Sequence, residues 1–153
     1  MAYGEAEITI RRSPKDIIDF VMDLREYRQV DEKLGKIHSI TPAEDGDGVL
    51  LNFSPKILGM PGPSTTQRVV RKNDERIDIS GIPAWTDALM TFTGFFTCQE
   101  VDEGTLVTRA LNFTFKKPFA VVFDPLFNRW LAKAVPEELA KAKEYLEAGK
   151  DSA

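Results

Sequence analysis

Arg109 is the residue in this sequence whose position most clearly suggests chemistry. It alternates along a predicted strand with apolar residues, namely Val107, Leu111, Phe113 and Phe115. A guanidinium turned toward that apolar face would need a negatively charged partner, because an unpaired buried charge is costly. A carboxylate, enolate or phenolate oxygen of a ligand would be a suitable partner.

The direction of Arg109 depends on the length of the turn that precedes its strand. A two-residue loop at residues 102–103 would pair Phe96 with Arg109 and turn Arg109 inward. A three-residue loop that ends at Gly104 would pair Phe96 with Ala110 and place Arg109 on the convex, solvated side. Glycine as the third loop residue favours the second register modestly, and an inward Arg109 is the alternative.

His38 is the only histidine of the chain, and histidine is a frequent acid or base near neutral pH. A catalytic base also needs a group that orients it, and the sequence offers none. Neither face of the segment 36–41 is clearly apolar, so we expect His38 to be exposed. No catalytic residue is assigned from the sequence.

Motifs for metals, phosphates and nucleophiles are missing. Residues 45–48 resemble a calcium loop, but its fifth and twelfth positions would be Val49 and Lys56, which lack the required side-chain oxygens. Residues 59–63 lack the lysine and the spacing of a phosphate-binding loop. No Gly-x-Ser-x-Gly, His-Glu-x-x-His or cysteine–histidine cluster occurs. We therefore expect neither a metal nor a cofactor.

The elements that would position these residues begin with a strand and a helix. Residues 5–12 alternate like a half-buried strand. Ser13 can cap the amides of a helix that starts at Pro14, and the apolar spacing that follows predicts two short helices or one bent helix. Turn signals then separate six further strands, expected at residues 36–41, 49–53, 65–72, 76–80, 87–99 and 105–115.

The links between these strands are too short for a crossover helix, which favours antiparallel pairing. The last segment, residues 119–147, carries apolar side chains at helical spacing and predicts a long helix that is kinked at Pro136.

Length and charge limit what the molecule can be. The 153 residues suit one domain over residues 1–149 with a short tail at 150–153. A net charge of −4 argues against a nucleic-acid partner, and the single Cys98 excludes an intramolecular disulfide. The acidic start shows no secretory signal and no apolar run is long enough to span a membrane, so we expect a cytoplasmic protein.

The segment Ile8-Thr-Ile-Arg-Arg-Ser-Pro-Lys-Asp-Ile-Ile-Asp-Phe-Val-Met-Asp-Leu-Arg-Glu-Tyr27 resembles the opening of the START/Bet v 1-like (SRPBCC) superfamily, in particular its polyketide cyclase/dehydrase-like branch. There a strand runs into a Ser/Ala-Pro helix start, and an Asp-Leu pair then precedes an aromatic residue. The hairpin at 102–108 and the closing helix are weaker matches. The resemblance implies an α+β helix-grip fold, in which a curved antiparallel sheet of about seven strands wraps around a long C-terminal helix, with two short helices after strand one.

A helix-grip fold implies a cavity between the sheet and the last helix, and the many aromatic residues on both predict that it is apolar and small. The candidate ligand-binding residues are Met90, Phe92, Phe96, Arg109, Phe113, Phe115, Phe123, Phe127 and Trp130. A gate loop over the cavity mouth is expected at Gly59, Met60, Pro61 and Gly62, with a plain connecting loop as the alternative.

The resemblance implies binding of a small hydrophobic or amphipathic ligand, such as a lipid or a polycyclic aromatic compound. The alternative is an enzyme of the cyclase, dehydratase or isomerase type, in which Arg109 or His38 handles an oxygen or a proton. A third interpretation is a protein-interaction module that uses the pocket rim. A homodimer is one assembly that the sequence leaves open.

Overall fold

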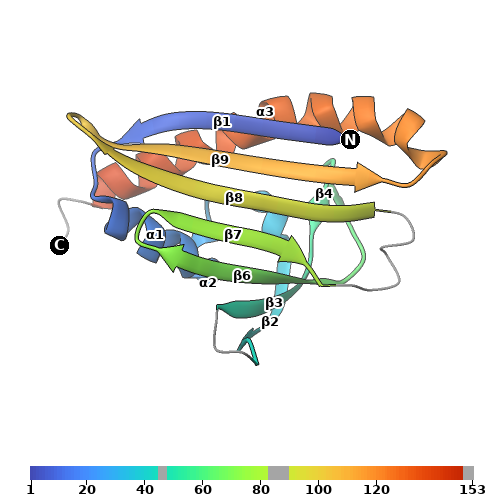
Figure 1. The fold of residues 1–153 in the computed structure, drawn as a ribbon, viewed down its shortest axis with the longest axis horizontal. Helices are drawn as coiled ribbons and strands as arrows, with labels where there is room; N and C mark the ends of the chain where they lie inside the picture. The colour runs from blue at the N-terminus through green and yellow to red at the C-terminus, as the bar shows by residue number, and fades with distance from the viewer. Residues whose placement is uncertain (45–47, 83–89, 150–153) are drawn as a thin grey trace.

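The computed structural model describes residues 1–44, 48–82 and 90–149 (Figure 1). Its elements, in chain order, are β1 (Ala2–Ile10), α1 (Pro14–Met22), α2 (Leu24–Tyr27), the 3-10 helix η1 (Glu32–Leu34), β2 (Lys36–Pro42), β3 (Val49–Ser54), β4 (Lys56–Ile57), β5 (Met60–Pro61), β6 (Thr65–Asn73), β7 (Arg76–Gly81), β8 (Met90–Val101), β9 (Gly104–Phe115) and α3 (Phe119–Gly149). The predicted turn at residues 45–47, the predicted strand start at 87–89, Trp85 and the tail 150–153 lie outside the described residues.

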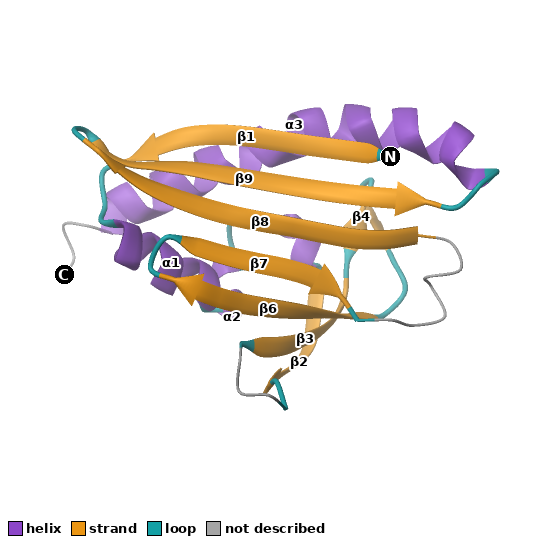
Figure 2. Ribbon diagram, in the orientation of Figure 1, coloured by secondary structure: helices purple, strands orange, loops and turns teal. Residues whose placement is uncertain are grey.

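Seven strands form one antiparallel sheet in the order β1-β9-β8-β7-β6-β3-β2. The first strand therefore pairs with the last, and the chain closes on itself at that edge. Figure 2 shows the helices gathered on one side of this sheet, with α3 running along β1 and β9. Strands β4 and β5 form a separate short hairpin. The α+β helix-grip fold expected from the sequence is confirmed.

The two short helices are separated by local capping. The Ser13 hydroxyl accepts a hydrogen bond from the Asp16 amide at 3.2 Å, and Pro14 occupies the first helical turn. Asp23 ends α1, and its carboxylate accepts a hydrogen bond from the Glu26 amide at 3.3 Å, which caps α2. The chain forms two helices rather than one bent helix because the same residue terminates the first and caps the second.

Helix α3 is continuous through both Pro125 and Pro136. It packs an apolar stripe against the sheet, formed by Phe127, Leu131, Val135, Leu139, Ala142 and Leu146. Close approach to β1 requires Gly4, because a Cβ atom there would lie 2.5 Å from Cβ of Leu131. The helix predicted over residues 119–147 is thus present, while the kink at Pro136 stays a prediction.

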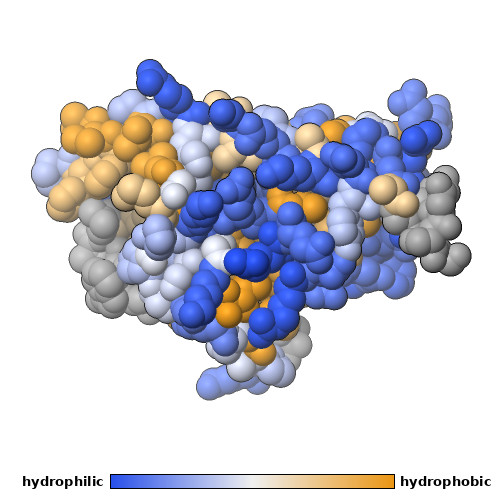
Figure 3. Space-filling view, turned by 180° about the vertical axis from the view of Figure 1, so that it is seen from behind, coloured by the Kyte–Doolittle hydropathy of each residue, from blue (hydrophilic) through white to orange (hydrophobic). Residues whose placement is uncertain are grey.

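The first turns of α3 leave apolar side chains uncovered. Figure 3 shows apolar surface at the end of the molecule where α3 begins. The exposed residues on these turns include Phe119, Val121, Val122 and Leu126. In the described part of the chain, no helix combines the length and the apolar character that a membrane span requires.

The hairpin between β8 and β9 has the register that the sequence favoured less. Val101 pairs with Gly104, so the turn consists of residues 102–103 and Phe96 pairs with Arg109. Gly104 is the first residue of β9 and not the third residue of the turn. Glycine is required there because its φ is 138° and because a Cβ atom would lie 2.3 Å from the carbonyl oxygen of Ile10. The prediction of a three-residue loop was wrong, and Arg109 points inward.

Candidate functional site

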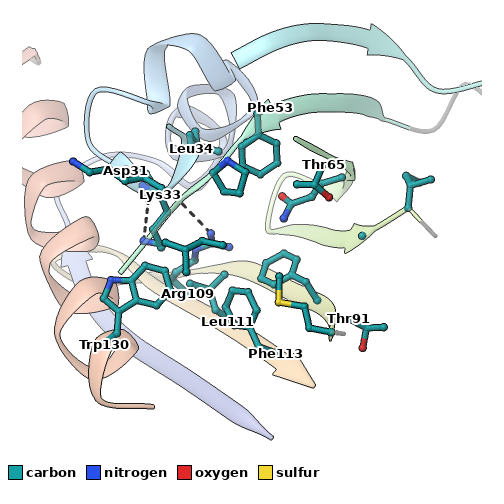
Figure 4. A pocket seen from close by; sticks show the side chains of 18 residues that line it. Asp31, Lys33, Leu34, Phe53, Thr65, Thr91, Arg109, Leu111, Phe113 and Trp130 are labelled. Carbon is teal, nitrogen blue, oxygen red and sulfur yellow. Dashed lines mark hydrogen bonds and ion pairs between the residues drawn. The ribbon is translucent and has the colours of Figure 1, made fainter. Parts of the chain in front are cut away.

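A cavity of about 90 Å³ lies between the sheet and α3 (Figure 4). Most of its wall is apolar, contributed by Leu34, Phe53, Ile57, Met90, Phe92, Leu111, Phe113 and Trp130. Three charged residues, Asp31, Lys33 and Arg109, gather at one side of it in Figure 4. The cavity is therefore small and mostly apolar, with one charged end, called the polar end below, and with Thr65 and Thr91 on its other side.

Some of the predicted ligand-binding residues line this cavity and others support its wall. Met90, Phe92, Arg109, Phe113 and Trp130 line it. The remaining predicted residues do not: Phe96 lies beneath the Arg109 guanidinium, and the other three, Phe115, Phe123 and Phe127, pack against one another. Phe127 also meets the ring of Phe113 edge-on at 5.2 Å, so this aromatic group holds the cavity wall in place.

The predicted gate loop forms part of the β4–β5 hairpin. Met60 and Pro61 are the two residues of β5, and Met60 is 67% exposed. Gly59 borders a groove beside the cavity, while Ile57 is the hairpin residue that reaches the cavity and the apolar core. The hairpin thus covers one side of the cavity, and its opening as a gate stays a prediction.

Five side chains from four separate segments meet at the polar end of the cavity. The "ionic cluster" consists of Asp31, Lys33, Arg109 and Glu138, with Tyr27 behind it. Lys33 Nζ lies 2.7 Å from Glu138 Oε1 and 2.9 Å from Asp31 Oδ1. Arg109 Nε donates to Glu138 Oε2 at 3.2 Å, and the Tyr27 hydroxyl donates to the same oxygen. The two carboxylates and two cations balance one another.

Three of these charges are almost entirely removed from water, and the fourth, Lys33, is half-buried. Asp31 is 3% exposed, Arg109 5% and Glu138 2%. The Arg109 guanidinium lies over the ring of Phe96, with its central carbon 4.3 Å from the ring centre. Arg109 Nη1 is buried and has no hydrogen-bond partner within the described residues. A buried donor without a partner is unusual in a folded protein and calls for an explanation.

The two carboxyl groups of the ionic cluster have pKa values shifted in opposite directions. Burial and the nearby charge of Glu138 raise the pKa of Asp31 above its usual range, and Lys33 and Arg109 offset this only in part. Burial also pushes the pKa of Glu138 upward, but the charges of Lys33 and Arg109 outweigh it and hold that pKa below its usual range. Asp31 is thus the carboxyl group of the two that accepts a proton more readily.

The basic and phenolic members keep their protons at neutral pH. Burial lowers the pKa of Lys33 and of Arg109, but Asp31 and Glu138 more than compensate, so both pKa values are raised. Burial and the same two carboxylates raise the pKa of Tyr27 well above its usual value. The cluster therefore offers two permanent cations and one hydroxyl donor.

A second hollow of about 390 Å³ lies beside the cavity, between α3 and the segments before β2 and around β4. It is lined by Leu58, Leu126, Arg129 and further residues of α3. The hollow shares Asp31, Lys33, Lys56 and Trp130 with the cavity. The side chains of Lys33 and Trp130 thus lie between the cavity and the neighbouring groove.

Sequence reasoning did not find Tyr27, Asp31, Lys33 or Glu138, because no motif links them. One signal was available for Glu138: it lies on the apolar stripe of α3, three residues after Val135, where a carboxylate needs a buried partner. His38 is exposed, as expected, and its Nε2 lies 2.8 Å from Ser54 Oγ, outside the residues that line the cavity. Among the described residues, no cluster of His, Cys, Asp or Glu could hold a metal ion.

Comparison with known proteins identifies a family and solved structures of similar fold. Residues 1–147 match the family described as polyketide cyclase / dehydrase and lipid transport. No curated protein matches the chain.

Three solved structures illustrate the similarity in fold. A START superfamily protein from Mycobacterium smegmatis is 21% identical with a TM-score of 0.72, over 95% of this chain and 99% of that one. TTHA0849 from Thermus thermophilus is 16% identical with a TM-score of 0.74, over 97% and 99%. The di-domain ARO/CYC StfQ from the steffimycin biosynthetic pathway is 14% identical with a TM-score of 0.72, over 96% of this chain and 51% of that one. At these identities the similarity shows the fold.

Proposed function

Because the chain belongs to the polyketide cyclase/dehydrase and lipid transport family, we propose that it binds a small hydrophobic or amphipathic molecule in the cavity between the sheet and α3. The observation that carries this proposal is the largely apolar, aromatic-rich lining that ends at Lys33 and Arg109. The apolar part of such a ligand would fill the cavity and pack against Phe92 and Phe113. Its polar end would contact the two cations, Lys33 and Arg109.

Binding of a ring-sized compound requires the lining to move. The cavity volume of about 90 Å³ is below the ~300–1,000 Å³ usual for small-molecule pockets. Met90 has a long, unbranched side chain that can adopt other rotamers, and Trp130 also faces the larger groove. Displacing these side chains joins part of the groove to the cavity.

Native mass spectrometry of protein purified from its own host tests the proposal. We expect a bound small molecule, whose mass identifies its chemical class. Leu111→Phe places extra volume in the cavity and should abolish the adduct, whereas Thr108→Phe on the opposite face of β9 should retain it. Binding in this cavity would be contradicted if Leu111→Phe carried as much bound ligand as the wild type while its melting temperature stayed close to that of the wild type.

A second candidate function, proton transfer of the cyclase or dehydratase type, is favoured by the ionic cluster. Asp31 and Glu138 have pKa values shifted apart, which is the arrangement of an acid and a base within one site. Lys33 and Arg109 would stabilise negative charge that develops on a substrate oxygen.

Deuterium exchange at the carbon beside a ketone tests this candidate without knowledge of the substrate. With 2-tetralone in heavy water, an enzyme of this type should exchange C–H for C–D faster than buffer does. The acceleration should be lost in Asp31→Asn and Glu138→Gln. An exchange rate equal to that in buffer would count against the enzyme and leave the binding proposal intact.

The assembly state and the location of the protein stay predictions. A homodimer is tested by light scattering on the purified chain, and a cytoplasmic location by fractionation of its host cells.

A further inference from the structure

The Arg109 guanidinium retains binding capacity that its neighbours do not use. Its Nε is bonded to Glu138, but its Nη2 lies 3.9 Å from Asp31 Oδ2, too far for a hydrogen bond. Its Nη1 is buried with no partner in the described part of the chain. An acceptor atom that reached this group would satisfy a donor that the protein leaves unsatisfied.

Lys33 adds a second cation at the same place. An ammonium group has three N–H donors, and two of those on Lys33 are directed at Asp31 and Glu138. Lys33 borders both the cavity and the groove, and Figure 4 shows its side chain beside that of Arg109. The polar end of the cavity therefore offers two convergent cationic donors, which is the chemistry of an oxygen-anion site.

Binding an anion there disturbs the charge balance of the ionic cluster. Without ligand, two carboxylates face two cations, and Asp31, Glu138 and Arg109 are each at most 5% exposed while Lys33 borders the groove. A third negative charge would leave one charge uncompensated, which is costly at this depth. The balance is restored when one carboxylate takes up a proton from solvent.

Asp31 is the carboxylate placed to take this proton. It faces Lys33 on its own segment, Glu138 from α3 and Arg109 from β9, with Tyr27 of α2 behind. Asp31 accepts a hydrogen bond from the Lys33 amide at 3.1 Å and lies 2.9 Å from Lys33 Nζ, but its closest arginine nitrogen is 3.9 Å away. Glu138 accepts hydrogen bonds from three side chains, those of Lys33, Arg109 and Tyr27. Glu138 is thus the better stabilised anion, and its charge together with burial favours the protonated form of Asp31.

We propose that the cavity selects ligands whose buried end is an anionic oxygen held by Lys33 and Arg109, and that Asp31 takes up one proton when such a ligand binds. This inference rests on the proposed binding function. The ligand stays ionised, the Asp31 carboxylate becomes a carboxylic acid, and the proton comes from the buffer. The cluster with its ligand then has the same net charge as the cluster without it.

Calorimetry with two matched probes tests the selection. The probes are 2-naphthoate and 2-naphthamide, which share one ring system and differ in charge. At pH 7 we expect 2-naphthoate to bind at least tenfold more tightly. Titrations in two buffers of different ionisation enthalpy should show uptake that approaches one proton per bound 2-naphthoate and none for 2-naphthamide.

Three variants assign the proton and the anion site. Asp31→Asn imitates the protonated carboxyl group, so it should bind 2-naphthoate as tightly as the wild type or more tightly, without proton uptake. Arg109→Met should lose the preference for 2-naphthoate and retain 2-naphthamide. Lys33→Met serves the same purpose if Arg109→Met fails to fold, as circular dichroism would show.

The outcomes separate this inference from the function on which it rests. Equal affinity for the two probes would overturn the inference while binding itself stands. Proton uptake that persists in Asp31→Asn would place the proton on the ligand or on another group and would overturn the role of Asp31. Failure of both probes to bind would contradict the proposed function for ring compounds and the inference with it.

Discussion

Trp130 lies where the aromatic residues, the cavity and the groove come together. Its ring meets Phe127 edge-on at 5.4 Å and also contacts the aromatic wall at Phe113. It borders the cavity on one side and the groove on the other. A ligand that fills the cavity or widens it toward the groove must therefore change the surroundings of this indole.

We expect ligands of micromolar affinity, such as decanoate, to quench the tryptophan fluorescence of the protein. Trp130→Phe should remove most of this quenching, because the remaining tryptophan, Trp85, was not expected at the cavity. Trp85→Phe is the matched control and should keep the effect. If the quenching survives in Trp130→Phe and disappears in Trp85→Phe, the cavity is not where the ligand binds.

At the scale of the element, the β8–β9 hairpin decides what faces the cavity. Successive residues of β9, from Thr105 to Phe115, point in turn to the helix side and to the outer side of the sheet. A shift of the strand register by one residue would therefore place Ala110 instead of Arg109 on the helix side. The two-residue turn at 102–103 sets this register, and Gly104 follows it at a positive φ against the backbone of Ile10.

Gly104→Ala should destabilise the protein by about 1–3 kcal/mol, because the alanine Cβ would meet the carbonyl oxygen of Ile10 at a strained φ. Urea unfolding measures the change. Gly81→Ala is the control, since a Cβ there has its nearest neighbour at 3.8 Å and should cost much less. Equal stability of Gly104→Ala and the wild type would contradict the register argument.

Pro136 lies in α3 two residues before Glu138, the residue through which the helix joins the ionic cluster. Proline lacks the N–H that would continue the helical ladder, so Pro136→Ala should raise the melting temperature. The same change should lower ligand affinity if it redirects the helix and moves Glu138 relative to Lys33. Pro125→Ala, earlier in the helix, is the comparison. Unchanged affinity in Pro136→Ala would show that the proline does not shape the site.

At the scale of the whole molecule, α3 links the two parts of the core. Its first half packs with Leu111, Phe113 and Phe115, and its second half packs with the short helices and the middle of the sheet. The ionic cluster lies between these parts and connects α2, η1, β9 and α3. The stability of the fold, and the ligand binding that we propose, therefore depend on charges contributed by distant segments.

Glu138→Gln should destabilise the folded protein by about 3–5 kcal/mol, because it leaves Lys33 and Arg109 buried with one carboxylate between them. The neighbouring Glu137→Gln is the control: its partner Lys133 lies 4.0 Å away on the surface, and the change should be below about 1 kcal/mol. Urea unfolding of both variants at pH 7 measures the two changes. A similar loss in the free energy of unfolding for Glu138→Gln and Glu137→Gln would argue against a structural role for the ionic cluster.

Glu147 connects the end of α3 to the end of β1. Its carboxylate accepts from Lys143 Nζ at 2.6 Å and from the Arg11 amide at 2.9 Å, which lower the pKa of Glu147 to about 2. Because the folded-state pKa is depressed, this stabilisation is present above the unfolded-state pKa of about 4.3 and is lost as the pH falls toward 2.

In Glu147→Gln, the free energy of unfolding should therefore be lower than in the wild type at pH 6, and the difference should shrink between pH 5 and pH 2. Glu144→Gln, on the same exposed end of α3, is the control. A difference that does not change with pH would mean that Glu147 acts by packing rather than by charge.

The order of the main strands and helices was predictable because their causes are local, although β1 spans Ala2–Ile10 rather than residues 5–12 and neither η1 nor the β4–β5 hairpin was predicted. Alternation marks the strands, Ser13 and Pro14 start α1, and Asp23 separates it from α2. These signals lie within a few residues of the structure that they specify. Together with the resemblance of residues 8–27, they sufficed for the fold class and for much of the cavity lining.

The tertiary structure decided the direction of Arg109 and the composition of the ionic cluster. Turn lengths of two and three residues differ little in local free energy, so the register was settled by the pairing of β9 with both neighbours. Asp31 and Glu138 are far apart in the chain, and only folding brings Lys33 and Arg109 between them. A buried charge is tolerated only with its partners, and apart from Lys33, which is two residues from Asp31, these partners lie too far along the chain for a local pattern to specify them.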